Sequence, residues 1–260
     1  PAAGGILSQW GYSVPAFTAA GVATLNFLAI FFLLPESLTE ERREEINQRK
    51  RLPFTIKALI EVLRRPKVGP LLHVRFFYGL GFATFQGIFS LYTQAIGLSA
   101  QTTGYILAYV GLISVIVQGA LIGQLTKRFR ENWLIITGLW VMALALLAWG
   151  FTTQLWVLLI VILPLGLAGG VLNTVLQSTI SKSVHRDEIG GILGIAGSLE
   201  AFTRVIAPSI GGLLLQSLGT WAPGVFSAVV MGWAVTFAYR RIILPSIRER
   251  RLAEAEAARA

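Results

Sequence analysis

Four long segments of this sequence contain no Asp, Glu, Lys or Arg: 1–35, 76–126, 132–181 and 205–239. Only 13% of all residues are charged, against about a quarter in soluble globular proteins. About 20 apolar residues cross a bilayer, so an uncharged segment of about 50 residues predicts two crossings joined by a neutral turn. We therefore expect an integral membrane protein of the all-α class.

The sequence predicts seven transmembrane helices, near 14–34, 71–93, 103–125, 133–151, 155–178, 189–215 and 222–243. The connections alternate between basic and uncharged, and the basic ones are 36–69, 126–132, 179–188 and the tail from 244. Short basic loops remain in the cytoplasm, so the C-terminus is expected there, and topology accounts for the net charge of +9. The basic segments lack interleaved aromatic residues, so no nucleic-acid partner is expected.

Several classes of site have no counterpart in the sequence. There is no Cys, and the two His residues, His73 and His185, stand at predicted membrane edges without partners at metal-ligand spacing. No zinc-protease motif, phosphate-binding glycine loop or nucleophile elbow occurs. We therefore expect no metal, no cofactor, no catalytic residue and no enzyme activity. The chain starts at Pro1 without a signal peptide, which indicates a part of a longer protein.

Two segments of the chain resemble each other. Both contain the pattern P-x-x-G-G followed four residues later by Gln, and the shared residues are Pro1, Gly4, Gly5 and Pro208, Gly211, Gly212. Each copy lies at the outward end of one predicted crossing and leads into an inward-running one. Parallel six-helix repeats of this kind are one architecture of membrane transporters.

These residues also carry a family resemblance. Residues 1–5 resemble the end of the fifth-helix antiporter motif of the major facilitator superfamily, and 34–37 are similar to the close of its sixth helix. Residues 81–92 resemble the seventh helix of its tetracycline-exporter-like, drug–proton antiporter branch. The family's loop motif is retained at Gly123 and Arg128 but altered at neighbouring positions, which weakens a gating role there.

The resemblance divides the chain into four parts. Residues 1–35 would be the end of helix five and helix six, 36–69 a linker, 70–244 the C-terminal six-helix bundle of a twelve-helix transporter, and 245–260 a tail. The linker contains a predicted amphipathic, cationic helix after Pro53. Such a helix would lie along the inner membrane surface, or would be a solvated linker without lipid contact.

Glu200 is the only acidic residue within a predicted crossing, and Arg204 follows it by one helical turn. A Glu four residues before a cation is the favourable orientation for an intrahelical ion pair. Glu200 could bind a proton or a cationic substrate, with Arg204 adjusting its proton affinity. Alternatively, the two side chains neutralise each other so that the helix can enter the membrane. Arg75, near the cytoplasmic edge, is expected to reach the headgroups, with an anion or gate contact as the alternative.

Neutral polar residues complete the candidate pathway: Gln86, Tyr92, Gln118, Asn173 and Gln177. They could line a substrate cavity or form hydrogen bonds between helices. Gln86 is the strongest of them, because a polar group among phenylalanines suits an amphipathic organic solute. Glycines on the neighbouring turns, at 166, 169 and 170, would permit sliding or close packing.

The resemblance implies a proton-coupled exporter of lipophilic organic compounds that alternates access by rocking two bundles. Its partners would be a small-molecule substrate, protons, the lipid bilayer and an N-terminal six-helix half, with a bacterial inner membrane as its location. Two alternatives remain open. One is a transporter of a metabolite such as a sugar or organic anion, with Arg75 or Arg204 as the anion contact. The other is a membrane scaffold or receptor that does not transport.

Overall fold

The computed structural model describes residues 7, 10–11, 13–34 and 56–248, and this part of the chain is helical without strands. The α-helices are α2 (Ser13–Leu33), α4 (Ile56–Arg64), α5 (Gly69–Ala95), α6 (Ala100–Ile116), α7 (Ile122–Arg128), α8 (Glu131–Gly150), α9 (Leu155–Lys182), α10 (Ile189–Leu218) and α11 (Ala222–Ala238). Shorter elements are the π-helices η2 (Val117–Leu121) and η4 (Tyr239–Ile243) and the 3₁₀ turn η3 (Arg186–Glu188). The motif residues Pro1, Gly4 and Gly5 lie outside the described residues.

All seven predicted crossings are helical. Six helices are long and apolar enough to cross a membrane by length and composition: Ser13–Leu33, Ala100–Arg128, Glu131–Gly150, Leu155–Lys182, Ile189–Leu218 and Ala222–Arg248. The remaining one, α5, has 27 residues and is therefore long enough, but it is less apolar. Three of its polar side chains, those of Arg75, Thr84 and Thr93, are buried within the protein.

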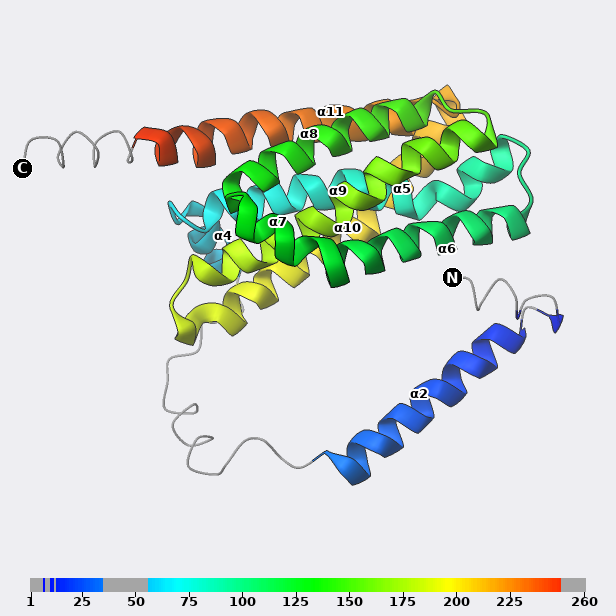
Figure 1. Cartoon of the computed structure of the whole chain (residues 1–260), viewed down its shortest axis with the longest axis horizontal. Coiled ribbons are helices and arrows are strands. Elements are labelled where there is room, and N and C mark those ends of the chain that lie inside the picture. Colours follow the sequence, from blue (N-terminus) through cyan, green and yellow to red (C-terminus); the bar gives the residue numbers. More distant parts are fainter. Residues whose placement is uncertain (1–6, 8–9, 12, 35–55, 249–260) are drawn as a thin grey trace, which may run out of the picture.

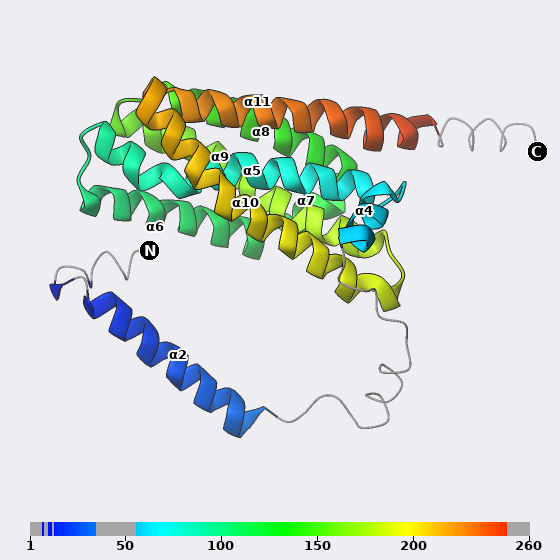
Figure 2. The ribbon, with the colours of Figure 1, turned by 180° about the vertical axis from the view of Figure 1, so that it is seen from behind.

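The helices α5 to α11 form one up-and-down bundle (Figure 1). Neighbouring helices pack in the order α6, α9, α8, α11, α5 and α10, and α9 also contacts α5 and α10. The same bundle is seen from behind in Figure 2. The chain reverses at each connection, so all basic connections gather at one end, called the basic end below. The other end, with uncharged turns, is called the neutral end.

Large apolar side chains fill the bundle where α5, α8 and α9 meet. Phe85 and Trp149 are buried and lie edge to face, with ring centroids 5.0 Å apart. Outward-facing positions of the same helices are also apolar, for example Trp140 and Leu144 of α8. A helix that is apolar all round fits a membrane span, where the outer face contacts lipid.

The linker helix α4 packs on the bundle. Val62 is almost fully buried, and Leu59 and Leu63 contact the core, so the apolar face of α4 is covered by protein. The two settings predicted for this helix, along the inner membrane surface or as a solvated linker without lipid contact, stay predictions. Arg65 adds an ion pair with Glu188 in the connection between α9 and α10, with 2.9 Å between Nη1 and Oε2.

The helix α2 lies apart from the bundle in both views (Figures 1 and 2). None of its residues is buried, and large apolar side chains such as Phe27 and Phe31 are exposed. The expected boundary of this crossing, 14–34, agrees with the observed helix Ser13–Leu33.

Candidate functional site

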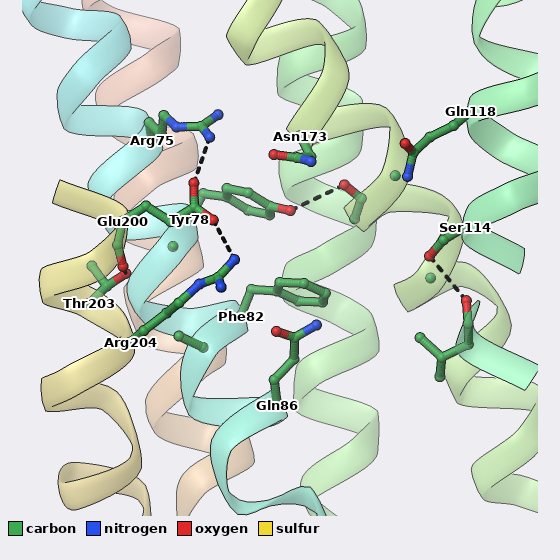
Figure 3. Close-up of a pocket in the computed structure, with 16 residues that line it drawn as sticks. Arg75, Tyr78, Phe82, Gln86, Ser114, Gln118, Asn173, Glu200, Thr203 and Arg204 are labelled. Atoms are coloured by element: carbon green, nitrogen blue, oxygen red, sulfur yellow. Dashed lines mark hydrogen bonds and ion pairs between the residues drawn. The ribbon is translucent and has the colours of Figure 1, made fainter. Parts of the chain in front are cut away.

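A cavity of about 220 Å³ opens between α5, α6, α9 and α10. Its polar lining residues are Arg75, Tyr78, Gln86, Ser114, Gln118, Asn173, Glu200, Thr203 and Arg204. Figure 3 shows α5 contributing one wall, with Tyr78, Phe82 and Gln86 directed toward Asn173 and Gln118 on the opposite side. Five residues that were predicted to line a pathway thus lie together: Gln86, Gln118, Asn173, Glu200 and Arg204. Arg75, which was expected to reach the headgroups, lies with them.

Glycines of α9 set the distance between the cavity walls. A Cβ added to Gly166 would lie 3.0 Å from the Ile113 side chain of α6, and one at Gly170 would lie 2.8 Å from Val117. The ring of Phe82 lies 3.3 Å from the corresponding position at Gly169. These contacts agree with close packing, the second of the two predicted roles for the glycines.

Glu200 holds two arginines. Arg204 Nη2 donates to Oε1 at 2.7 Å, which confirms the predicted pair within α10. Arg75 Nη2 donates to the other oxygen, Oε2, also at 2.7 Å. Arg75 is only 7% exposed, so the prediction that it reaches the headgroups is wrong. Its position on α5 turns it toward α10, where a carboxylate compensates its charge.

A second cavity of about 200 Å³ lies next to the first, on the side of the basic end. It is lined by Arg75, Gln177, Ile180, Leu193, Ala196, Gly197 and Glu200. Gln177 therefore lines this second cavity, whereas Asn173, one turn away on α9, lines the first. Since Arg75 and Glu200 line both, their ion pair stands between the two cavities.

Tyr78 is a site residue that the sequence analysis missed. Its hydroxyl donates to the backbone oxygen of Gly169 at 3.1 Å, and its ring stacks on Phe82 with 5.7 Å between centroids. Arg75, Tyr78, Phe82 and Gln86 follow one another at three- and four-residue spacing, which places them on one face of α5. This periodicity could have identified Tyr78, because two members of the series were already candidates. Ser114 and Thr203 were missed as well, and small hydroxyl residues carry little signal in a membrane helix.

Tyr92 lines neither cavity, so of its two predicted roles only the hydrogen bond between helices is observed. Its side chain is fully buried near the neutral end. The hydroxyl donates to the backbone oxygens of Trp149 and Thr152, which ties α5 to the end of α8. A buried phenol requires a hydrogen-bond partner, and carbonyl oxygens at the end of α8 supply it.

The residues of the second P-x-x-G-G pattern and of the loop motif differ in their surroundings. Pro208 packs so closely on α5 that a Cβ at Gly87 would lie 2.6 Å from its Cγ. A Cβ at Gly211 would lie 2.9 Å from the Ile88 side chain of α5, whereas Gly212 has open space. Gly123 and Arg128 lie in exposed positions near the basic end, outside both cavities.

Comparison with known proteins decides the family. The family model of the Major Facilitator Superfamily matches residues 1–135 and 71–260. The protein belongs to this superfamily. The family predicted from its motifs is thereby confirmed, and multidrug and tetracycline resistance proteins are among its relatives, as the resemblance to that branch predicted.

Three relatives illustrate the range of the matches. Solute carrier family 22 member 18 of Rattus norvegicus is 29% identical over 218 residues, covering 83% of this chain and 53% of the relative. Multidrug resistance protein 2 of Bacillus subtilis is 24% identical over 240 residues, covering 89% and 57%. Tetracycline resistance protein, class C, of Escherichia coli is 27% identical over 256 residues, covering 95% and 60%.

A solved structure shares the fold. The human organic anion transporter MFSD10 (TETRAN) superposes with a TM-score of 0.68 at 21% identity, covering 87% of this chain and 57% of that one. The chain thus spans about half the length of the curated relatives it matches. As a member of the superfamily it is an integral membrane protein. Among the described residues, no cluster of His, Cys, Asp or Glu could hold a metal ion.

Proposed function

We propose that the complete protein is a proton-coupled secondary active transporter that exports lipophilic organic compounds by alternating access. The observation that carries this proposal is the position of Glu200, which holds two arginines at the boundary between two cavities inside a membrane bundle. Ionisable residues within a membrane are costly and commonly mark a proton or substrate path. A scaffold would gain nothing from such a group.

Proton binding at Glu200 gives a physical means of coupling. A charged Glu200 holds Arg75 on α5 and Arg204 on α10, so it ties these two helices together. A proton on the carboxyl group removes this ionic attraction and leaves the buried Arg75 without its counter-ion. The side chain of Glu200 is 32% exposed, so breaking its pair with Arg75 costs less than the roughly 3–5 kcal/mol of a fully buried pair. About 1.4 kcal/mol already shifts the balance between two conformations tenfold.

Alternating access requires an opposing bundle. We propose that an N-terminal six-helix half closes the open side of the first cavity, and that the linker 36–69 connects the two halves. Its α4 is held against the bundle by Val62 and by the Arg65–Glu188 ion pair. We place the basic end and the C-terminus in the cytoplasm, because the basic loops follow the positive-inside rule. Bacterial relatives support a bacterial inner membrane as the location.

The direction of transport is part of the same proposal. Relatives named as multidrug and tetracycline resistance proteins support export. Export against a gradient requires an energy source, and a proton moving inward through Glu200 would supply it. Neutral compounds suit this exchange, because their binding does not oppose the negative charge that Glu200 acquires when it releases its proton.

The test is substrate-induced proton release from energised inside-out vesicles that contain the full-length protein. A panel of lipophilic bases and neutral compounds would be added, and the internal pH followed with an indicator. We expect release with the wild type and with Glu131→Gln, whose carboxylate binds Lys182 at the basic end, outside both cavities. Release should disappear in Glu200→Gln. Release that persists in Glu200→Gln would remove Glu200 from the coupling path, and the absence of release with every compound would overturn proton-coupled export.

A further inference from the structure

We propose that the first cavity is a binding site for the charged group of an amphipathic organic anion, with Arg75 as its principal contact. That such a compound is also transported rests on the function proposed above. Binding itself does not depend on coupling, so the two proposals can fail separately.

Arg75 has unused hydrogen-bonding capacity. Only Nη2 has a partner, the Glu200 carboxylate at 2.7 Å. Nε and Nη1 are buried, and no acceptor in the described part of the chain lies within hydrogen-bond distance of either. Buried donors without partners are rare in native proteins because each carries an unrelieved desolvation cost. Since Arg75 lines the cavity, a carboxylate or sulfonate that enters can accept from these donors.

The charge of the cavity lining also favours an anion. Its ionised side chains are Arg75, Arg204 and Glu200, which gives two positive charges against one negative charge. An anion on Arg75 would leave Arg204 paired with Glu200, so that each arginine then has one carboxylate. A cation would instead add to the excess positive charge of this lining.

The remaining walls suit an apolar body with a few polar groups. The stacked rings of Tyr78 and Phe82 form an aromatic surface one to two helical turns from Arg75 (Figure 3). The amide of Gln86 continues the same wall of the cavity. The amides of Gln118 and Asn173 lie on the opposite wall, and all three are exposed. An aromatic ring that carries one acidic group would therefore place the acid at Arg75 and its ring along Phe82. Apolar pockets with a few polar groups are the usual form of small-molecule sites.

Binding of an anion and binding of a proton at Glu200 should favour each other. The charged or titratable groups facing Glu200 are Arg75 and Tyr78 of α5 and Arg204 of its own helix, while α9 presents only the amides Asn173 and Gln177. An anion beside Glu200 repels its negative charge, and by thermodynamic reciprocity a proton on Glu200 strengthens anion binding. An organic acid would then move together with a proton, whereas the proposed exchange applies to neutral compounds.

The test uses the full-length protein in nanodiscs of phosphatidylcholine and three probes of similar shape. They are 2-naphthoate, its neutral amide, and the cationic 2-naphthylmethylamine. We expect affinity to fall in that order in the wild type. Tighter binding of the amine than of naphthoate would overturn the proposal without any variant. Competition by added phosphatidylglycerol would also overturn it, because the anion would then be a lipid headgroup.

Variants then locate the contact. Arg75→Met should weaken naphthoate binding about tenfold or more, while amide binding changes little. Arg128→Gln, an exposed cation at the basic end, should leave both unchanged. Glu200→Gln should strengthen naphthoate binding because it removes the repelling carboxylate. Unchanged naphthoate affinity in Arg75→Met would refute the assignment, and Arg75→Lys provides a folded alternative if Arg75→Met does not yield protein.

Measurements of proton uptake and release distinguish the anion site from export by proton exchange. Naphthoate binding should take up protons from a weakly buffered solution in the wild type, and not in Glu200→Gln. If binding follows Arg75 but no compound releases protons in the vesicle experiment, export by exchange fails and the anion site stands. If proton release depends on Glu200 but Arg75→Met leaves the affinity for naphthoate unchanged, export by exchange stands and the anion site fails.

Discussion

The backbones of Gly150 and Gly224 are in direct contact: a Cβ placed on Gly224 would lie 2.4 Å from the Cα of Gly150. This contact joins the neutral ends of α8 and α11. Close approach of this kind is how membrane helices gain packing energy, since lipid offers little hydrophobic drive for their association.

Replacement of Gly224 by alanine should therefore separate these two helices. We expect Gly224→Ala to lower the free energy of unfolding by about 1–3 kcal/mol, the usual cost of overpacking. Gly232→Ala, on the same helix but with open space at its Cβ position, is the matched control and should be neutral. Thermal unfolding in detergent measures both. Equal stability of the two variants would show that the contact is not maintained.

Tyr92→Phe tests whether this residue is structural. The change removes the hydroxyl donor from the carbonyls of Trp149 and Thr152, of which Trp149 keeps the Thr152 N–H, so stability should fall by about 1 kcal/mol. Transport kinetics of the folded protein should be unchanged. Tyr105→Phe, which removes an exposed hydroxyl, is the control. A changed apparent substrate affinity without a loss of stability would return Tyr92 to the substrate pathway.

Gln86→Leu should weaken binding of a transported compound. Gln86 is exposed to the first cavity, and a lost neutral hydrogen bond corresponds to about 0.5–1.5 kcal/mol, or roughly a two- to tenfold rise in apparent KM. Gln94→Leu, at the neutral end of the same helix and outside the cavity, provides the comparison. Uptake assays with the full-length protein report the difference. Identical KM values would mean that Gln86 only lines the cavity.

The Arg65–Glu188 ion pair of the linker should be weaker than the Arg75–Glu200 ion pair of α5. Arg65 and Glu188 are about one-third exposed, so a double-mutant cycle with Arg65→Gln and Glu188→Gln should give a coupling energy below about 1 kcal/mol. The corresponding cycle for Arg75 and Glu200 should give a larger value, because the side chain of Arg75 is 8% exposed, while that of Glu200 is 32% exposed. Denaturant unfolding of the four variants of each cycle supplies the comparison. Equal coupling energies would contradict the burial argument.

Periodicity explains why part of the site was predictable. Glu200 and Arg204 lie on one helix, so their spacing alone predicted the ion pair that α10 forms. Gln86, Gln118 and Asn173 were found because an amide within an apolar crossing is conspicuous. Tyr92 is equally conspicuous, but its hydroxyl donates to backbone carbonyls at the end of α8, near the neutral end. Sequence distinguishes a polar side chain from its apolar neighbours, but it does not state which carbonyl or cavity the side chain meets.

The sequence alone determined the membrane class, the positions of the crossings and the alternation of the loops, because hydropathy and helix length are local properties fixed by the bilayer. Its motifs also identified the superfamily. Only the tertiary structure decided that Arg75 turns inward to Glu200, that α4 packs on the bundle, and that two cavities meet at one ion pair. Those features depend on the rotation of each helix about its axis and on the order in which helices pack. Contacts such as Gly166 with Ile113 and Gly224 with Gly150 set that arrangement between residues far apart in the chain.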